Sequence, residues 1–282
     1  MKSIQIIKSD GSKQRYKRRK LIKSLINSGV KRDLADKIAK EIEQRLSGET
    51  ITSSALYQLA YDLVKERSFG LHLNYNLKTA LFRLGPTGYP FEKFVASVLS
   101  SYGYSVETDV VLQGSCVSHE IDVLAEKKDK VFFVESKFHN SASSKTNVKT
   151  TLYIYARYLD LTENSENTNR WYGKALNPWI FTNTKFTQDA VKYALCKGFR
   201  LTSWNYPEKN NLAKIIERKF LHPITIFSDI DEFVFQQAFA KGVVTLKDFV
   251  DKPDLAQEVF ADKYVSLKLQ VQSLLSSFSS PV

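Results

Sequence analysis

The segment HEIDVLAEKKDKVFFVESKFHN, residues 119–140, constrains the fold most strongly, because it predicts a β-hairpin whose pairing can be deduced. Two apolar runs are joined by the charged tetrapeptide at residues 127–130. If this tetrapeptide forms the loop, the register follows, and Asp122 lies directly across from Glu135. Each apolar run therefore carries a carboxylate where a strand would usually carry an apolar side chain.

The same register divides the hairpin into two faces. One face is expected to be core: Ile121, Val123 and Ala125 opposite Ser136, Val134 and Phe132. The other face collects four charged residues: Glu120, Asp122, Glu135 and Lys137. Like charges opposite each other destabilise a sheet unless a positive charge lies between them. Carboxylate oxygens favour Mg²⁺ or Mn²⁺, so the pattern predicts a metal site formed by Asp122 and Glu135.

Two neighbouring groups extend this prediction. The ammonium of Lys137, on the same face as Glu135, is suited to hold an attacking water or to neutralise developing negative charge. A helix that starts at Pro90 is expected to bury one face and to leave Glu92 beside it. The alternative is a surface hairpin in which Glu120 and Lys137 form an ordinary ion pair, since Glu-x-Lys is common in strands.

The net charge of +11 favours a polyanionic partner, nucleic acid above all, because Lys and Arg displace counterions from a phosphate backbone. A basic composition that serves solubility alone is the alternative. Two cysteines, Cys116 and Cys196, are too few for a disulfide framework and lack C-x-x-C spacing. With no apolar leader and no stretch long enough to span a membrane, we expect a cytoplasmic protein with no membrane partner.

Three segments are expected along the chain. Residues 1–85 open with a strand and continue as helices, among them one over Leu73–Leu84. In residues 86–207 strands alternate with helices, and the last elements form a β-α-β unit whose helix is capped by Thr187. This pattern predicts an α/β core with a parallel strand pair. Residues 208–282 are helical, with an expected role in DNA binding or dimerisation.

The middle segment resembles the PD-(D/E)xK nuclease superfamily and, within it, the Mrr-type restriction endonucleases. The resemblance runs from Gly88 to Trp204 and rests on Phe91-Glu92, Gly103-Tyr104, Gln113-Gly114, Glu120-Ile121-Asp122, Glu135-Ser136-Lys137 and FTNTKFTQDAVKYALCKGF. Ile121 replaces the usual proline.

This resemblance implies a restriction-endonuclease-like mixed β-sheet core flanked by helices. It also implies Mg²⁺ bound by Asp122 and Glu135, water activation by Lys137 and a contribution from Glu92. A two-fold dimer is the expected assembly, because cutting both DNA strands needs two sites. His119 and His139 flank the motif, and both a direct role and that of an ordinary loop histidine remain open.

The stretch IIKSDGSKQRYKRRKLIKSL resembles the ATP-cone, a mostly helical, nucleotide-binding regulatory domain. The resemblance implies that Lys8, Arg15 and Lys20 contact the phosphates of ATP or dATP. The basic run at residues 17–20 opposes the dipole of the helix it begins, a conflict that a nucleotide triphosphate or the DNA backbone would relieve. The sequence contains no G-x-x-x-x-G-K-[ST] motif, so nucleotide sensing is expected rather than hydrolysis.

Together these features predict a Mg²⁺-dependent DNA endonuclease with type IV restriction-like phosphodiester hydrolysis, regulated by ATP or dATP. Its expected substrate is double-stranded DNA that is modified or foreign. One alternative is a non-catalytic, nucleotide-sensing DNA-binding regulatory protein. Another is a structure-selective DNA repair or junction nuclease, which would share this chemistry and differ in the DNA shape it accepts.

Overall fold

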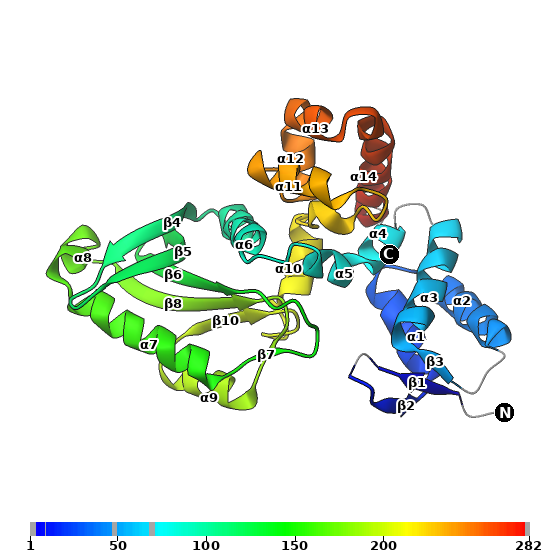
Figure 1. Cartoon of the computed structure of the whole chain (residues 1–282), viewed down its shortest axis with the longest axis horizontal. Helices are drawn as coiled ribbons and strands as arrows, with labels where there is room; N and C mark the ends of the chain where they lie inside the picture. Colours follow the sequence, from blue (N-terminus) through cyan, green and yellow to red (C-terminus); the bar gives the residue numbers. More distant parts are fainter. Residues whose placement is uncertain (1–3, 9, 47–49, 68–70, 280–282) are drawn as a thin grey trace. The chain divides into compact units, whose positions relative to one another are not determined.

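The chain divides into two compact units in the computed structural model, which describes residues 4–8, 10–46, 50–67 and 71–279 (Figure 1). The first unit comprises Met1–Lys78 with Phe260–Val282, and the second comprises Thr79–Val259. These units differ from the three expected segments. Residues 208–259 fold with the sheet-containing middle segment, whereas the C-terminal helix falls with the N-terminal residues.

The first unit combines a small sheet with helices. Its strands, in the order β2-β1-β3, are β1 (Gln5–Ile7), β2 (Lys13–Arg15) and β3 (Thr50–Thr52). Its helices are α1 (Arg18–Asn27), α2 (Arg32–Arg45), α3 (Ser53–Arg67), α4 (Leu71–Tyr75), η2 (Ala261–Lys263) and α14 (Tyr264–Ser279). Leu25, Ile38 and Leu63 lie in its core. The single helix expected over Leu73–Leu84 is instead α4 followed by a separate α5 (Leu77–Phe82).

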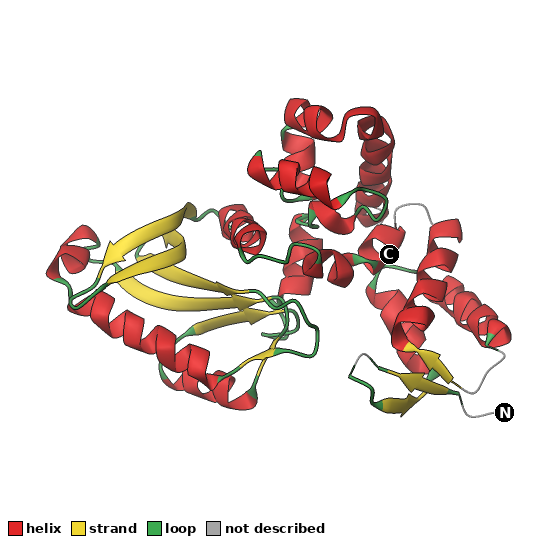
Figure 2. Ribbon diagram, in the orientation of Figure 1, coloured by secondary structure: helices red, strands yellow, loops and turns green. Residues whose placement is uncertain are grey.

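The second unit is built on a five-stranded mixed sheet in the order β10-β8-β6-β5-β4 (Figure 2). Its strands are β4 (Ser105–Gln113), β5 (Ser118–Lys127), β6 (Lys130–Lys137), β8 (Ala175–Thr182) and β10 (Arg200–Ser203), and β7 (Lys145–Thr146) pairs separately with β9 (Lys185–Phe186). Strands β4, β5 and β6 are antiparallel, whereas β6, β8 and β10 are parallel. The predicted β-α-β unit and the mixed α/β fold class are therefore confirmed.

Helices flank this sheet. They are α6 (Tyr89–Ser101), α7 (Val148–Glu163), α8 (Ser165–Arg170) and α9 (Gln188–Cys196). Thr187 caps α9 as predicted, because its side chain accepts the Ala190 backbone N–H at 3.3 Å. No helix in the described part of the chain combines the length and the apolar character that a membrane span requires.

Residues 208–259 add further helices to the second unit. They are α10 (Leu212–Lys219), η1 (Ile224–Ile226), α11 (Glu232–Ala240), α12 (Leu246–Asp251) and α13 (Pro253–Phe260). The guanidinium of Arg83 donates to the carbonyl groups of Thr225, at 2.9 Å, and Phe227, at 3.1 Å. Lys219 Nζ donates to the Ser101 carbonyl at the end of α6. These bonds join the region to the segments before the sheet.

The β5–β6 hairpin has the predicted register. Pairing runs from Val123↔Val134 to Lys127↔Lys130, and the turn consists of Lys128 and Asp129, shorter than the expected loop. Lys128 has a positive φ of 54°, which suits a two-residue hairpin turn.

The face of the hairpin that carries the acids is itself mostly core, which corrects the expectation of a charged face. Leu124, Val131 and Phe133 are buried together with Ile154 and Leu161 of α7. Parallel strands are normally covered by helices on both faces, and β6 is a parallel neighbour of β8. The carboxylates therefore lie at one end of a buried face.

Candidate active site

Asp122 lies where β5 and β6 separate. The backbone pairing between β5 and β6 stops at Val123↔Val134. Beyond this pair, the Ser136 backbone N–H donates to Asp122 Oδ2 at 2.6 Å. A side chain thus replaces a backbone hydrogen bond and fixes this carboxylate beside the next strand. Burial, and then the nearby charge of Glu135, raise the pKa of Asp122 to about 7.

Arg157 of α7 joins the two strands at the same place. Its Nη1 donates to Glu135 Oε2 at 2.9 Å, and its Nη2 donates to the backbone carbonyl of Glu120. The Arg157 side chain is only 8% exposed and that of Glu135 only 15%. Arg157 therefore orients Glu135, and it brings a buried positive charge to the carboxylates.

Arg157 was not among the residues predicted from the sequence. The sequence feature that could have identified Arg157 is its place in the helix periodicity, because Ile154, Arg157 and Leu161 follow the i, i+3, i+7 spacing of a buried helix face. An arginine on such a face needs a buried acceptor, because a buried charge is costly without a partner. Only the packing of α7 on the sheet identifies that acceptor as Glu135.

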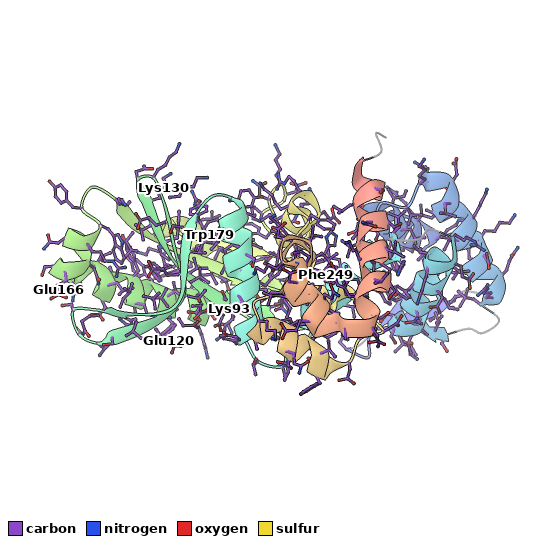
Figure 3. The ribbon with its side chains drawn as sticks, turned by 90° about the horizontal axis from the view of Figure 1, so that it is seen from above. Lys93, Glu120, Lys130, Glu166, Trp179 and Phe249 are labelled. Atoms are coloured by element: carbon purple, nitrogen blue, oxygen red, sulfur yellow. The ribbon has the colours of Figure 1, made fainter. Side chains whose placement is uncertain are left out.

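Glu92, on α6, joins the same electrostatic cluster. Partial burial raises its pKa, and the charges of Asp109, Glu120 and Glu135 raise it further. The neighbouring Lys93 donates to Asp109 Oδ2 at 2.7 Å. Figure 3 shows Lys93 and Glu120 toward the same end of the sheet. The structure thus brings Glu92, Asp122 and Glu135 close enough for mutual repulsion.

Lys137 follows Glu135 on β6 and is exposed. It lies next to Thr182 of β8 in the parallel register. Within residues 71–279 it forms no ion pair with Glu120, so the ordinary ion pair weighed as an alternative is not present. Its amine stands two residues beyond Glu135, and none of the described carboxylates pairs with it.

Both flanking histidines have partners outside the carboxylate cluster. His119 Nε2 lies 2.7 Å from Asp160 Oδ2. The Cys116 backbone N–H also donates to Asp160, and this bond is the main reason why the pKa of that carboxyl falls to about 2. His139 Nε2 lies 2.9 Å from Thr146 Oγ1. These contacts hold the loops on either side of the site.

The carboxylates of Asp122 and Glu135 have the donor atoms that a divalent cation requires. Among the described residues, no group of three or more His, Cys, Asp or Glu side chains is arranged to hold a metal ion by itself. Ser136 donates to one oxygen of Asp122, and Arg157 donates to one oxygen of Glu135. No described protein group donates to the other oxygens, Asp122 Oδ1 and Glu135 Oε1. Mg²⁺ usually takes one or two carboxylates and keeps several waters, so this donor pair fits it.

The basic residues predicted to bind a nucleotide lie in the first unit. Arg15 and Lys20 line one hollow of about 240 Å³, together with Tyr57 and Tyr75, whereas Lys8 is not among its lining residues. The rings of Tyr57 and Tyr75 are stacked with centroids 5.0 Å apart. Two of the three predicted phosphate ligands therefore share one aromatic-walled hollow.

Residues 87–228 match the family model described as the nuclease-related domain. The chain belongs to the nuclease-related domain family. An uncharacterized protein of Archaeoglobus fulgidus is 41% identical over 156 residues, which are 55% of this chain and 83% of that protein. The matched range contains the sheet, Arg157 and all four predicted catalytic residues.

Two solved structures are similar to parts of the chain. The crystal structure of AF1548, a protein of unknown function, is 35% identical with a TM-score of 0.53, and the match covers 68% of this chain and 97% of that one. The MspJI restriction endonuclease, solved in complex with a 27-mer oligonucleotide, is 12% identical with a TM-score of 0.32, over 48% of this chain and 29% of that one.

Proposed function

We propose that this member of the nuclease-related domain family is a Mg²⁺- or Mn²⁺-dependent DNA endonuclease that hydrolyses phosphodiester bonds in the manner of a type IV restriction enzyme. The supporting observation is the position of Asp122 and Glu135 at the point where β5 and β6 separate, with Lys137 next on β6. A net charge of +11 suits a DNA partner. Two copies acting as a homodimer would cut both strands.

Each residue has a distinct role in this proposal. Asp122 and Glu135 would hold the metal ion, and Glu92 adds negative charge from α6. When bound, Mg²⁺ would polarise the scissile phosphate and lower the pKa of a coordinated water. Lys137 steadies the attacking water or the charge that develops on the phosphate. Arg157 keeps the Glu135 carboxylate in its orientation.

A plasmid assay tests this function. Protein, supercoiled plasmid and Mg²⁺ are expected to give nicked and linear DNA, and Lys137→Ala should slow cleavage by about 10²-fold or more, because it removes a charge that stabilises the transition state. Lys130→Ala, at the far end of β6, is the matched control. Intact DNA with methylated, unmethylated and junction substrates would favour a non-catalytic DNA-binding protein. Cleavage of the junction alone would favour a repair nuclease.

Metal binding is expected to depend on pH. Protons compete with the metal for Asp122, whose pKa is about 7, so the apparent affinity should rise about tenfold per pH unit up to that value and then level off. Calorimetric titration with Mn²⁺ at several pH values measures this. Asp122→Asn should remove both the binding and its pH dependence. An affinity that is unchanged between acidic and alkaline buffer would contradict the assignment of Asp122.

We also propose that the first unit binds ATP or dATP as a regulatory ligand, as the ATP-cone resemblance implies. The hollow shared by Arg15 and Lys20 supports this, because it offers cations beside aromatic rings. Arg15→Ala and Lys20→Ala are each expected to weaken ATP binding by about tenfold, measured by calorimetry. Arg19→Ala, an exposed α1 variant outside the hollow, should bind normally. Equal affinities for all four proteins would refute the site.

A further inference from the structure

A second hollow, of about 490 Å³, lies in the unit that contains the sheet. Here called the aromatic pocket, it is lined chiefly by Tyr102, Tyr104, Trp179, Arg200 and Tyr206. Trp179 pairs with Val134, whereas the next residue, Ile180, pairs with Glu135. Because successive strand residues point to opposite faces, Trp179 faces away from the side that carries Glu135.

The two sites are separated by the thickness of the sheet, because Trp179 lies level with Val134, one residue from Glu135, but on the other face. Figure 3 shows Lys130 and Glu120 toward opposite ends of the sheet, with Trp179 between them. Lys127, at the hairpin turn, donates to the carbonyl of Tyr102 and so belongs to the pocket end. The aromatic pocket is therefore separate from the candidate active site.

Cations lie over the rings of this pocket. The guanidinium carbon of Arg200 is 5.1 Å from the centroid of the Trp179 ring. Lys219 Nζ is 4.8 Å from the Tyr102 ring, and Lys127 Nζ is 5.4 Å from the Tyr104 ring. Tyr104 and Trp179 meet edge to face with their centroids 6.2 Å apart. Aromatic surface and positive charge are thus interleaved.

The three cations that lie over these rings, of which Arg200 also lines the pocket, lack acidic partners within the described residues. Arg200 donates to Tyr104 Oη at 3.5 Å, and Lys219 donates to the Ser101 carbonyl at 3.2 Å. None of Arg200, Lys219 and Lys127 forms an ion pair with a carboxylate there. By contrast, Lys93 and Lys174, also in this unit, each have one, with Asp109 and Glu126 respectively. Uncompensated charge beside half-buried rings that line an open pocket is complementary to an anionic aromatic ligand.

We propose that the aromatic pocket binds an unstacked nucleotide of a single-stranded DNA segment. Its base would lie against the rings of Tyr102, Tyr104 and Trp179, and its phosphates beside Arg200, Lys127 and Lys219. Base stacking on aromatic side chains within a basic groove is how proteins hold single strands without reading sequence. A duplex keeps its bases stacked inside, so the pocket should favour a single strand.

Fluorescence anisotropy with a labelled oligo-dT of about 12 nucleotides tests this proposal, with EDTA present so that no cleavage occurs. Tyr102→Ala and Arg200→Ala should each weaken binding by about tenfold, while Tyr102→Phe should restore it, because a phenyl ring still stacks. Arg170→Ala is the matched control, since Arg170 also lies over a ring, that of Trp171, outside the pocket. Circular dichroism of each variant establishes that it is folded.

Competitors distinguish the ligands. An abasic oligonucleotide of the same length should compete about tenfold less well than oligo-dT, because it offers no base to stack. Equal competition by the two, or an equal effect of Tyr102→Ala and Tyr102→Phe, would refute the proposal. Free dTMP that competes as well as the oligonucleotide would also refute it, in favour of a mononucleotide site. Because EDTA abolishes metal-dependent cleavage in this assay, a protein without nuclease activity can still give the expected binding, so failure of the proposed function leaves this result unaffected.

Discussion

Asp122→Asn is expected to reduce the rate of Mg²⁺-dependent DNA cleavage by about 10³-fold or more, the largest loss of activity predicted for a single substitution. The amide can still accept the Ser136 N–H at the end of the ladder, but it lacks the charge that a hard cation requires. Single-turnover cleavage of plasmid measures the effect. Asp129→Asn, in the turn of the same hairpin, is the matched control and should cleave at the normal rate.

The same substitution is expected to stabilise the fold. The pKa of Asp122 rises from 3.8 to about 7 on folding, so the folded protein holds its proton more tightly than the unfolded chain. Stability therefore falls as pH rises between these two values, and above pH 7 the ionised carboxylate carries the full penalty. Asp122→Asn should raise the free energy of unfolding by about 2 kcal/mol at alkaline pH, and by little at acidic pH. Urea unfolding at both pH values measures this, and a variant that is less stable at alkaline pH would contradict it.

Arg157→Ala is expected to lower the free energy of unfolding by about 3 kcal/mol, because it leaves Glu135 buried without its partner. The Glu120 carbonyl loses its donor in the same step. Arg157→Lys keeps the charge but cannot reproduce the two-pronged contact, so its stability should lie between those of Arg157→Ala and the natural chain. Denaturant unfolding gives the values.

Arg170→Ala is the control for this second prediction. The Arg170 side chain is 49% exposed and its guanidinium lies 4.0 Å from the Glu107 carboxylate, so its removal should change the free energy of unfolding by less than about 0.5 kcal/mol. A loss as small for Arg157→Ala as for Arg170→Ala would show that Glu135 does not depend on its arginine. Opposite effects of Asp122→Asn and Arg157→Ala on stability are the expected signature of a site that concentrates negative charge.

The hairpin illustrates how far local sequence could predict the site. The charged loop set the pairing of Val123 with Val134, because strand residues alternate between faces and a short connection leaves little freedom of register. The placement of Asp122 beside Glu135 followed from that register. The prediction that this whole face is charged was wrong, because burial of the face depends on whether a helix covers it. The covering helix, α7, comes later in the chain.

By itself, the sequence determined the register of the hairpin, the positions of most helices and the mixed α/β class. These depend on neighbouring residues: side-chain periodicity, turn chemistry and helix caps. Only the tertiary structure decided that Arg157 holds Glu135, that residues 208–259 fold with the sheet, and that Tyr102, Trp179 and Arg200 form one pocket. Those contacts join residues far apart in the chain, and their partners are selected by packing and by the cost of burying unpaired charge.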